Sequence, residues 1–260
     1  MQYRMLAPVA LMLLVTDPVD AQGFGYAPGD ARYQATVVTT MSRELGGQRM
    51  EDEVTQRQQF TVSLKSVGRD TLRIGLTLDS ASVVSRTEGP QDVSQIVGLS
   101  VEGHLSPVGE VYSSRLTRGD LGPASGMIAA ELARFLPIVR NDLRAGMAWT
   151  DTTTENVEML GVPIRRRVVT TSTVAGDTMV AGQPTWRIDR TSRVSFAGEG
   201  SIQGQALSLE GSSTTDGRIF VTRAGRFLGS TQTDSSTTKV SSGDVSFSVN
   251  QTQRANVALR

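Results

Sequence analysis

Cysteine and histidine, two residue types that often act as nucleophile, general base or metal ligand, are almost missing from this 260-residue sequence. The sequence contains no cysteine and a single histidine, His104. Without cysteine there is no thiolate nucleophile, disulfide or cysteine-ligated zinc, and one histidine cannot build a multi-histidine metal centre. His104 lies in the segment Gly103–Pro107, where a strand is expected to end, and no Gly-x-Ser-x-Gly motif supplies a serine partner. We interpret His104 as an exposed or locally hydrogen-bonded residue, and we predict no metal site, no cofactor and no catalytic residue.

Carboxylates form two local groups that could suit a hydrolase. Glu51, Asp52 and Glu53 are contiguous, and Glu155 lies close to Glu158. Glycosidase-type catalysis needs two carboxyl groups that face each other at a defined separation. Alternation along a strand would instead point Glu51 and Glu53 one way and Asp52 the other. Both groups lie in polar stretches, which favours a solvated face, and a carboxylate-based hydrolase stays as an alternative function.

Glycine and arginine motifs indicate structure more than chemistry. The glycines of residues 198–204 lack the spacing of a dinucleotide-binding loop and predict a bend or bulge in a sheet. Arg165–Arg167 is the only basic run; it could meet an acidic headgroup, but at a strand start it is more typical of a charged edge that blocks edge-to-edge pairing. The chain has 26 basic and 26 acidic residues, a balance that argues against nucleic acid as a partner.

The first 21 residues predict an export signal. Arg4 precedes an apolar run, Met5–Val15, whose 11 residues fall short of the roughly 20 that span a bilayer. Val19 and Ala21 supply the small residues expected before a cleavage site. We therefore expect residues 1–21 to be a signal peptide, and a mature protein that is periplasmic or extracellular and has no transmembrane segment.

Most of the remaining chain shows the period of two that is typical of strands with one buried face. Phe60–Leu64, Leu72–Leu78 and Val245–Val249 alternate apolar and polar residues. Pairs such as Gly176-Asp177 and Asp216-Gly217 predict turns between strands. Short connections of this kind produce antiparallel meanders.

One segment has the period of a helix. Residues 125–136 place four apolar side chains on one stripe, and Pro137 ends the pattern. We predict a mainly β (α+β) fold, which is a large curved antiparallel meander sheet or half-barrel with one covering helix near residues 125–136. The four residues of the stripe are Ile128, Leu132, Phe135 and Leu136.

The domain organisation predicted is simple. Residues 22–29 are expected to be a flexible leader and residues 30–260 a single β-rich domain. The Asp-Thr pairs at 70–71 and 177–178, each beside a glycine, leave open an alternative of two related halves that meet near residues 115–145.

The alternating strands and the helix together predict an enclosed apolar surface. An ordinary packed core explains such a surface. The functional alternative is that a wide, curved sheet with one helical lid cannot fill its own concavity and holds an apolar ligand there. The candidate ligand-binding residues are Phe60, Val62, Leu64, Leu72, Ile74, Leu76, Leu78, Met127, Ile128, Leu132 and Phe135.

The second half of the chain resembles a known group of proteins. Leu143–Asp151 (LRAGMAWTD) is followed by long strands and by Trp186-Arg187-Ile188. This order resembles exported bacterial β-rich proteins of uncharacterised function, and is more distantly similar to the periplasmic lipoprotein-carrier half-barrels. The latter resemblance implies a curved antiparallel sheet that is lined by helices and holds acyl chains. This sequence has one clear helix where those carriers have several, so no binding residue is transferred.

Three functions follow as hypotheses. The first is a non-enzymatic exported envelope protein that binds an apolar or lipid-like ligand, or a protein partner, on a curved sheet. The second is a structural or surface interaction module without a small-molecule ligand. The third is the carboxylate-based hydrolase.

Overall fold

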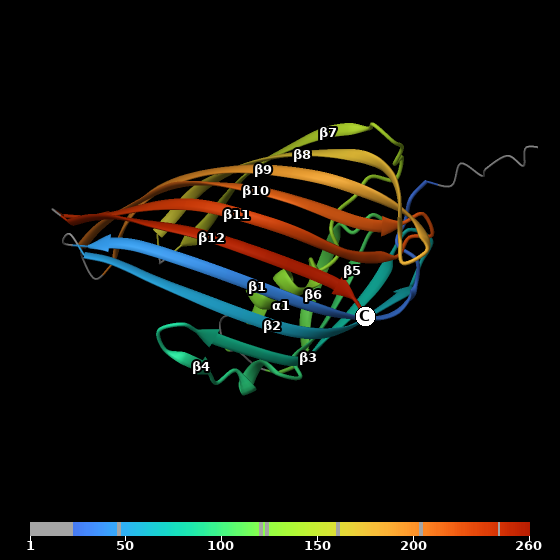
Figure 1. Ribbon diagram of the computed structural model, residues 1–260, viewed down its shortest axis with the longest axis horizontal. Helices are drawn as coiled ribbons and strands as arrows, with labels where there is room; N and C mark the ends of the chain where they lie inside the picture. Colours follow the sequence, from blue (N-terminus) through green and yellow to red (C-terminus); the bar gives the residue numbers. More distant parts are fainter. Residues whose placement is uncertain are drawn as a thin grey trace, which may run out of the picture.

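A single antiparallel sheet of twelve strands dominates the protein (Figure 1). The computed structural model describes residues 23–45, 48–119, 122, 125–159, 162–202, 205–243 and 245–260. A 3-10 helix, η1 (Ser94–Ile96), and an α-helix, α1 (Ser125–Ala133), interrupt the strands. The strands are β1 (Gly29–Leu45), β2 (Gln48–Ser66), β3 (Leu72–Ser85), β4 (Gly89–Gln91), β5 (Ser100–Leu105), β6 (Val111–Arg118), β7 (Ala148–Met159), β8 (Val162–Val180), β9 (Gln183–Ile202), β10 (Gln205–Thr222), β11 (Phe227–Ser242) and β12 (Val245–Leu259).

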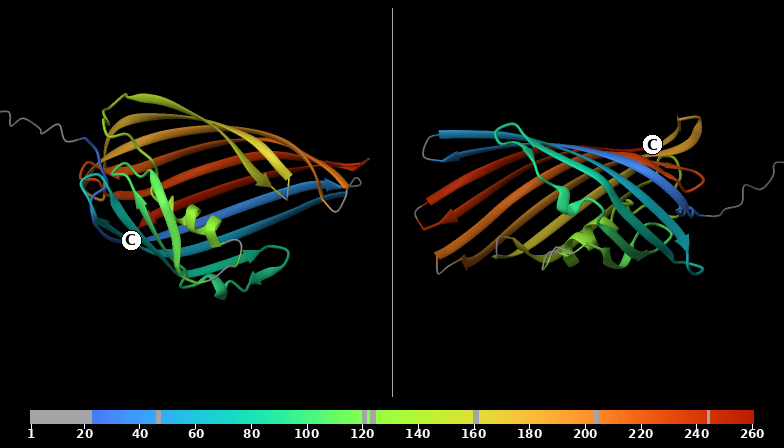
Figure 2. Two further views of the ribbon diagram at one scale, coloured as in Figure 1. Left: turned by 180° about the vertical axis from the view of Figure 1, so that it is seen from behind. Right: turned by 90° about the horizontal axis from the view of Figure 1, so that it is seen from below.

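The strand order is β6-β5-β3-β2-β1-β12-β11-β10-β9-β8-β7, with β4 paired to β3. The first and last strands meet in the middle of the sheet, where Tyr33 pairs with Leu259 and Arg43 with Val249. In the described part of the chain β6 and β7 do not pair with each other, so the sheet is curved but open (Figures 1 and 2). This architecture confirms the predicted mainly β fold with one curved antiparallel sheet and one short α-helix.

The concave face carries the main core. The predicted alternation is confirmed in β2 and β3, where Phe60, Val62 and Leu64 and the even-numbered residues from Leu72 to Leu78 are all buried. They pack with Tyr33 and with residues of β8 to β11. Burial of this apolar area, at about 25 cal/mol per Å², is the main force that holds the curved sheet to the segments in its concavity.

The helix α1 lies inside the concavity, against β5 and β6 (Figure 2). It is shorter than predicted, because residues 134 and 135 bond back three positions, to Glu131 and Leu132, in a tight last turn. Its most buried face is also different: Ala129 and Ala133 pack on Val101 of β5. Gly103 permits this close approach, since a Cβ there would lie 3.3 Å from Cβ of Ala133.

Several predicted turns and edges are wrong. Gly176-Asp177 and Asp216-Gly217 lie inside β8 and β10. Gly176 follows a register shift, and the turn after β8 lies instead at Ala181 and Gly182, which both have positive φ. Gly217 allows close packing and does not form a turn, because a Cβ built on it would lie 3.0 Å from the carbonyl oxygen of Thr231.

The predicted edge and bulge are also wrong. Arg165–Arg167 do not form a sheet edge, because β8 pairs with β7 on one side and β9 on the other. The β9–β10 ladder runs through Gly198 and Gly200 with no register shift. Gly198 instead lets the backbone of Pro163 approach closely, since a Cβ there would overlap the Pro163 carbonyl.

The described part of the expected leader, residues 23–28, is packed. Phe24 and Tyr26 are buried in the main core, and their N–H groups donate to the carbonyls of Asn141 and Pro107. Two aromatic side chains supply enough apolar area to hold this segment, which differs from the flexible leader expected from the sequence. The predicted signal peptide and Gln22 lie outside the described residues.

No helix in the described part of the chain is long and apolar enough to cross a membrane.

Candidate functional site

The strand residues predicted to bind a ligand lie in the packed core. None of the seven is more than 9% exposed. Ile128, Leu132 and Phe135 are half-buried, and the side chain of Met127 lies outside the described part of the structure. The ring of Phe135 contacts those of Tyr33 and Phe227. Apart from Phe60, Val62 and Leu64, which also border hollows near the end of the sheet, the accessible concave surface is made by other residues.

A row of polar side chains crosses the concave face beyond the core. These residues, which we call the polar band, pair across neighbouring strands and share the face of the core. Their side chains hydrogen-bond to one another: Thr215 donates to Asp234 at 2.6 Å, and the hydroxyls of Thr170 and Ser192 are 2.8 Å apart. The polar band consists of Thr39, Thr170, Ser192, Thr215, Asp234 and Gln253.

An apolar path follows β1 and β2 and crosses the polar band at Thr39, which pairs with Val54. Val37, Val54 and Met41 are half-buried and share the inner face with Tyr33, and Met50 follows at the rim. Met50 pairs with Arg43, so the path extends along β1 from Val37 to the level of Arg43. This is a rise of six residues, or about 20 Å of strand. We call these four residues the apolar floor.

The apolar floor ends in a pocket of about 440 Å³. Met41, Met50 and Val249 supply its apolar wall, and residues of the β3–β4 connection close one side. Methionine fills irregular space and adapts to varied apolar shapes. The lining residues of this methionine pocket are Met41, Ser42, Arg43, Met50, Glu51, Asp52, Thr87, Glu88 and Val249.

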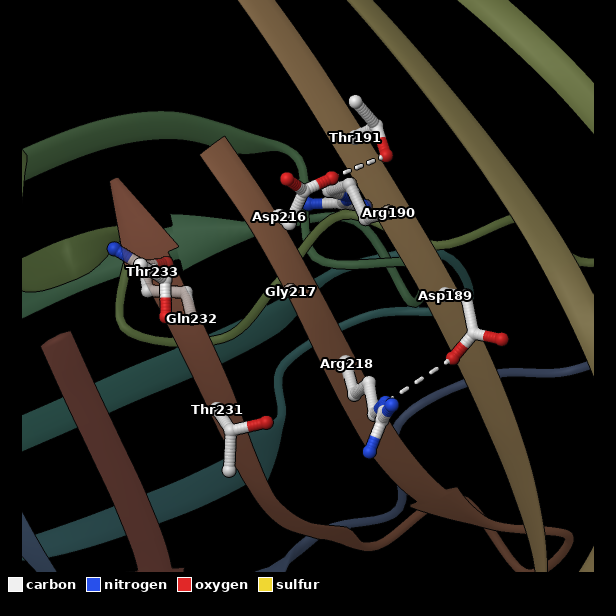
Figure 3. A pocket seen from close by; sticks show the side chains of 9 residues that line it. All are labelled: Asp189, Arg190, Thr191, Asp216, Gly217, Arg218, Thr231, Gln232 and Thr233. Carbon is white, nitrogen blue, oxygen red and sulfur yellow. Dashed lines mark hydrogen bonds and ion pairs between the residues drawn. The ribbon is translucent and has the colours of Figure 1, made fainter. Parts of the chain in front are cut away.

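A second pocket, of about 230 Å³, lies at the other end of the concave face, below the segment that follows α1. Phe135, Ile219 and Phe227 form its apolar wall, and Arg134, Arg190 and Gln232 supply polar groups. Gly217 occupies the inner position between Arg190 and Gln232 (Figure 3). We call this the helix-end pocket; its other lining residues are Pro137, Thr215, Arg218, Ser230 and Thr231.

Arg190 holds the helix-end pocket together. Its Nη2 donates to the carbonyl of Ile138 at 2.7 Å, and its Nε lies 3.4 Å from the hydroxyl of Ser172. Burial lowers the pKa of Arg190, an effect that the charges of Tyr26 and Asp151 oppose. Sequence reasoning missed this residue, although the alternation that starts at Ile188 in β9 places Arg190 on the buried face.

The convex face over Gly217 bears a shallow depression that contains two carboxylates (Figure 3). Thr191 donates to Asp216 at 2.8 Å, and Asp189 forms ion pairs with Arg187 and Arg218, 3.3 and 3.8 Å from its Oδ1. Both carboxylates are therefore engaged by hydroxyl or guanidinium groups at the surface, an arrangement that suits a solvated, ion-paired face.

The other titratable candidates are engaged locally. His104 is exposed, with Nδ1 3.2 Å from the hydroxyl of Ser113, which confirms the structural interpretation. Glu155 pairs with Arg166 at 3.0 Å across β7 and β8. The side chain of Glu158 lies outside the described residues.

Asp52 faces inward from β2 and accepts hydrogen bonds from the hydroxyl of Ser85 at 3.0 Å and the N–H of Thr87 at 3.2 Å. Although burial opposes it, these bonds lower the pKa of Asp52. Asp52 therefore fixes the β3–β4 connection over the methionine pocket.

No protein-family model matches this chain, and the comparison with curated proteins finds none that is similar to it.

Proposed function

We propose that this chain is an exported, non-enzymatic protein that binds a lipid-like ligand along the concave face of its sheet. The observation that carries the proposal is that two pockets and the apolar floor share the concave face, and that the floor ends in one of the pockets. Ligand sites are typically concave and mainly apolar with a few placed polar groups. Each pocket has an apolar wall, made by Met41, Met50 and Val249 in one and by Phe135, Ile219 and Phe227 in the other, beside polar lining groups.

The two sides of the concave face favour an amphiphile over a plain hydrocarbon. An apolar chain that lies on Val37, Val54 and Met41 would pass from water onto an apolar surface. This transfer favours binding by roughly 0.8 kcal/mol for each CH₂ that is buried. The polar band meets this path at Thr39, and on the strands beyond it the hydroxyls of Thr170 and Ser192, and Thr215 with Asp234, are bonded to one another. The path of about 20 Å exceeds half of the roughly 30 Å hydrocarbon core of a bilayer, so one leaflet's acyl chain fits along it.

The proposal is tested with N-phenyl-1-naphthylamine, a neutral dye that fluoresces in apolar surroundings. We expect saturable binding of about one dye per chain. Dodecanoate should displace the dye competitively, and organic extraction of the protein purified under native conditions should release a lipid that mass spectrometry detects. A folded protein that shows neither saturable dye binding nor an extractable lipid would overturn the proposal.

A second candidate, a surface interaction module without a small ligand, is favoured by the convex face. Its outward positions on β10 and β11 are largely serine and threonine, and most are exposed. The two sheet edges, β6 and β7, are each paired on one side only in the described chain, and such edges can accept another strand. A concentration-dependent mass in analytical ultracentrifugation, with no dye binding, would support this candidate instead.

A further inference from the structure

Arg190 is a half-buried cation for which the described residues provide no carboxylate partner. Its two hydrogen bonds within the described chain go to a carbonyl and a hydroxyl, and it takes part in none of the ion pairs of the described chain. A desolvated charge is costly unless it is paired. A guanidinium has five N–H donors, so two bonds leave donors for another group.

The helix-end pocket gives Arg190 space for an anionic partner. Arg134, in the turn after α1, lines the same pocket, and its described lining includes no aspartate or glutamate. Phe135 lines the same pocket, and its ring contacts that of Phe227, so aromatic surface and two guanidinium groups share one pocket. Positive donors beside apolar aromatic rings are the combination that an amphiphile with an anionic head requires.

Two carboxylates face inward on the strands around the pocket, Asp151 and Asp234, and neither replaces such a partner. Asp151 acts on Arg190 electrostatically from β7, but it is exposed at the sheet edge and forms no ion pair with Arg190. Asp234 belongs to the polar band, where Thr215 donates to it. The pocket itself therefore keeps an excess of positive charge.

We propose that the helix-end pocket holds the anionic head of the ligand, a carboxylate or a phosphate, between Arg134 and Arg190, while the apolar chain extends across the concave face toward Val37 of the apolar floor, which lies in the same row of paired residues as Arg190. This assignment rests on the proposed function and adds the chemical class of the head. The head would complete the hydrogen bonding of Arg190. Gln232 lies on β11, on the other side of Gly217 from Arg190, and would contact the head from there.

The test compares three ligands of equal chain length: dodecanoate, dodecyl phosphate and dodecanol. We expect at least one of the two anions to bind the native chain about tenfold more tightly than dodecanol, because hydrogen bonds to charged groups contribute about 1.5–3 kcal/mol. The stronger anion identifies the head as a carboxylate or a phosphate. Raising the salt concentration should weaken the binding of the anion and leave the affinity for dodecanol unchanged.

Two variants assign the preference to the pocket. Arg134→Gln should lower the affinity for the anion several-fold with no effect on dodecanol, and Arg190→Gln should abolish the preference. Arg144→Gln, exposed and outside the pocket, is the matched control and should behave as the native chain. If Arg190→Gln does not fold, the salt dependence and Arg134→Gln still decide the outcome. Equal affinity for all three ligands would overturn this inference and leave the proposed function standing, whereas no binding of any ligand would overturn the proposed function.

Discussion

The hydroxyl of Tyr26 donates a hydrogen bond of 2.7 Å to the carbonyl of Pro137, which lies 111 positions further along the chain. This bond fixes the N-terminal segment to the turn that follows α1, and that turn forms the roof of the helix-end pocket. Burial raises the pKa of Tyr26, so its hydroxyl stays protonated and able to donate. The end of the concave face at the helix-end pocket is therefore held by a contact between Tyr26 and Pro137, which are far apart in the sequence.

Tyr26→Phe removes this donor and leaves a buried carbonyl without its partner. We expect the free energy of unfolding to fall by about 1–3 kcal/mol, which urea titration followed by circular dichroism would measure. Tyr112→Phe is the control, because Tyr112 is 59% exposed and should tolerate the change. An equal loss in both variants would show that the Tyr26–Pro137 bond contributes nothing specific.

Two glycine substitutions, one in β5 below α1 and one within α1, should have opposite effects on stability. In Gly103→Ala the new Cβ would lie 2.9 Å from the carbonyl oxygen of Ser113, so we expect a loss of about 1–3 kcal/mol from overpacking. In Gly126→Ala the new methyl group meets nothing within 4 Å, so reduced freedom of the unfolded chain should stabilise the protein by about 0.5–1 kcal/mol. Thermal unfolding midpoints measure both. A stabilised Gly103→Ala variant would contradict the close packing of α1 on β5.

Asp52 should make stability depend on pH in the acidic range. Its pKa in the folded protein is lowered, so its ionised form stabilises the fold above about pH 4, and this contribution is lost as the pH falls further. Asp52→Asn should therefore melt below the native chain at pH 6, and the difference should shrink at pH 3. A difference in melting temperature that is the same at both pH values would count against the hydrogen bonds from Ser85 and Thr87.

The sequence predicted the fold class well and the accessible site poorly, for identifiable reasons. Strict alternation in Leu72–Leu78 follows from one buried face, so the pattern determines strand and face together. Gly217 was assigned to a turn because glycine serves both turns and close backbone approach, and local sequence does not separate the two uses. The most apolar strands became packed core, which removed their side chains from the surface that a ligand would touch.

Long-range pairing explains the remaining differences. Arg190 is recognisable as buried only when the period of two is extended from Ile188, and its hydrogen bond to Ile138 joins residues 52 positions apart. Phe24 and Tyr26 lie in a glycine-rich segment that predicts a flexible leader. Their N–H groups donate to the carbonyls of Asn141 and Pro107, which are distant in the sequence. None of these contacts has a signature within a short window of sequence.

The most direct test of the central claim is the affinity for N-phenyl-1-naphthylamine of a matched pair of variants on β1. Met41 lies on the apolar floor, and its neighbour Thr40 is exposed on the convex face. Met41→Asp and Thr40→Asp each introduce one negative charge opposite an acidic neighbour, Asp52 and Glu53 respectively, so the two variants are matched in charge and in pairing. If the concave face binds the ligand, Met41→Asp should weaken dye binding by about tenfold or more while Thr40→Asp stays close to the native value, with both variants folded by circular dichroism. Equal dye affinities in the two folded variants would contradict the account.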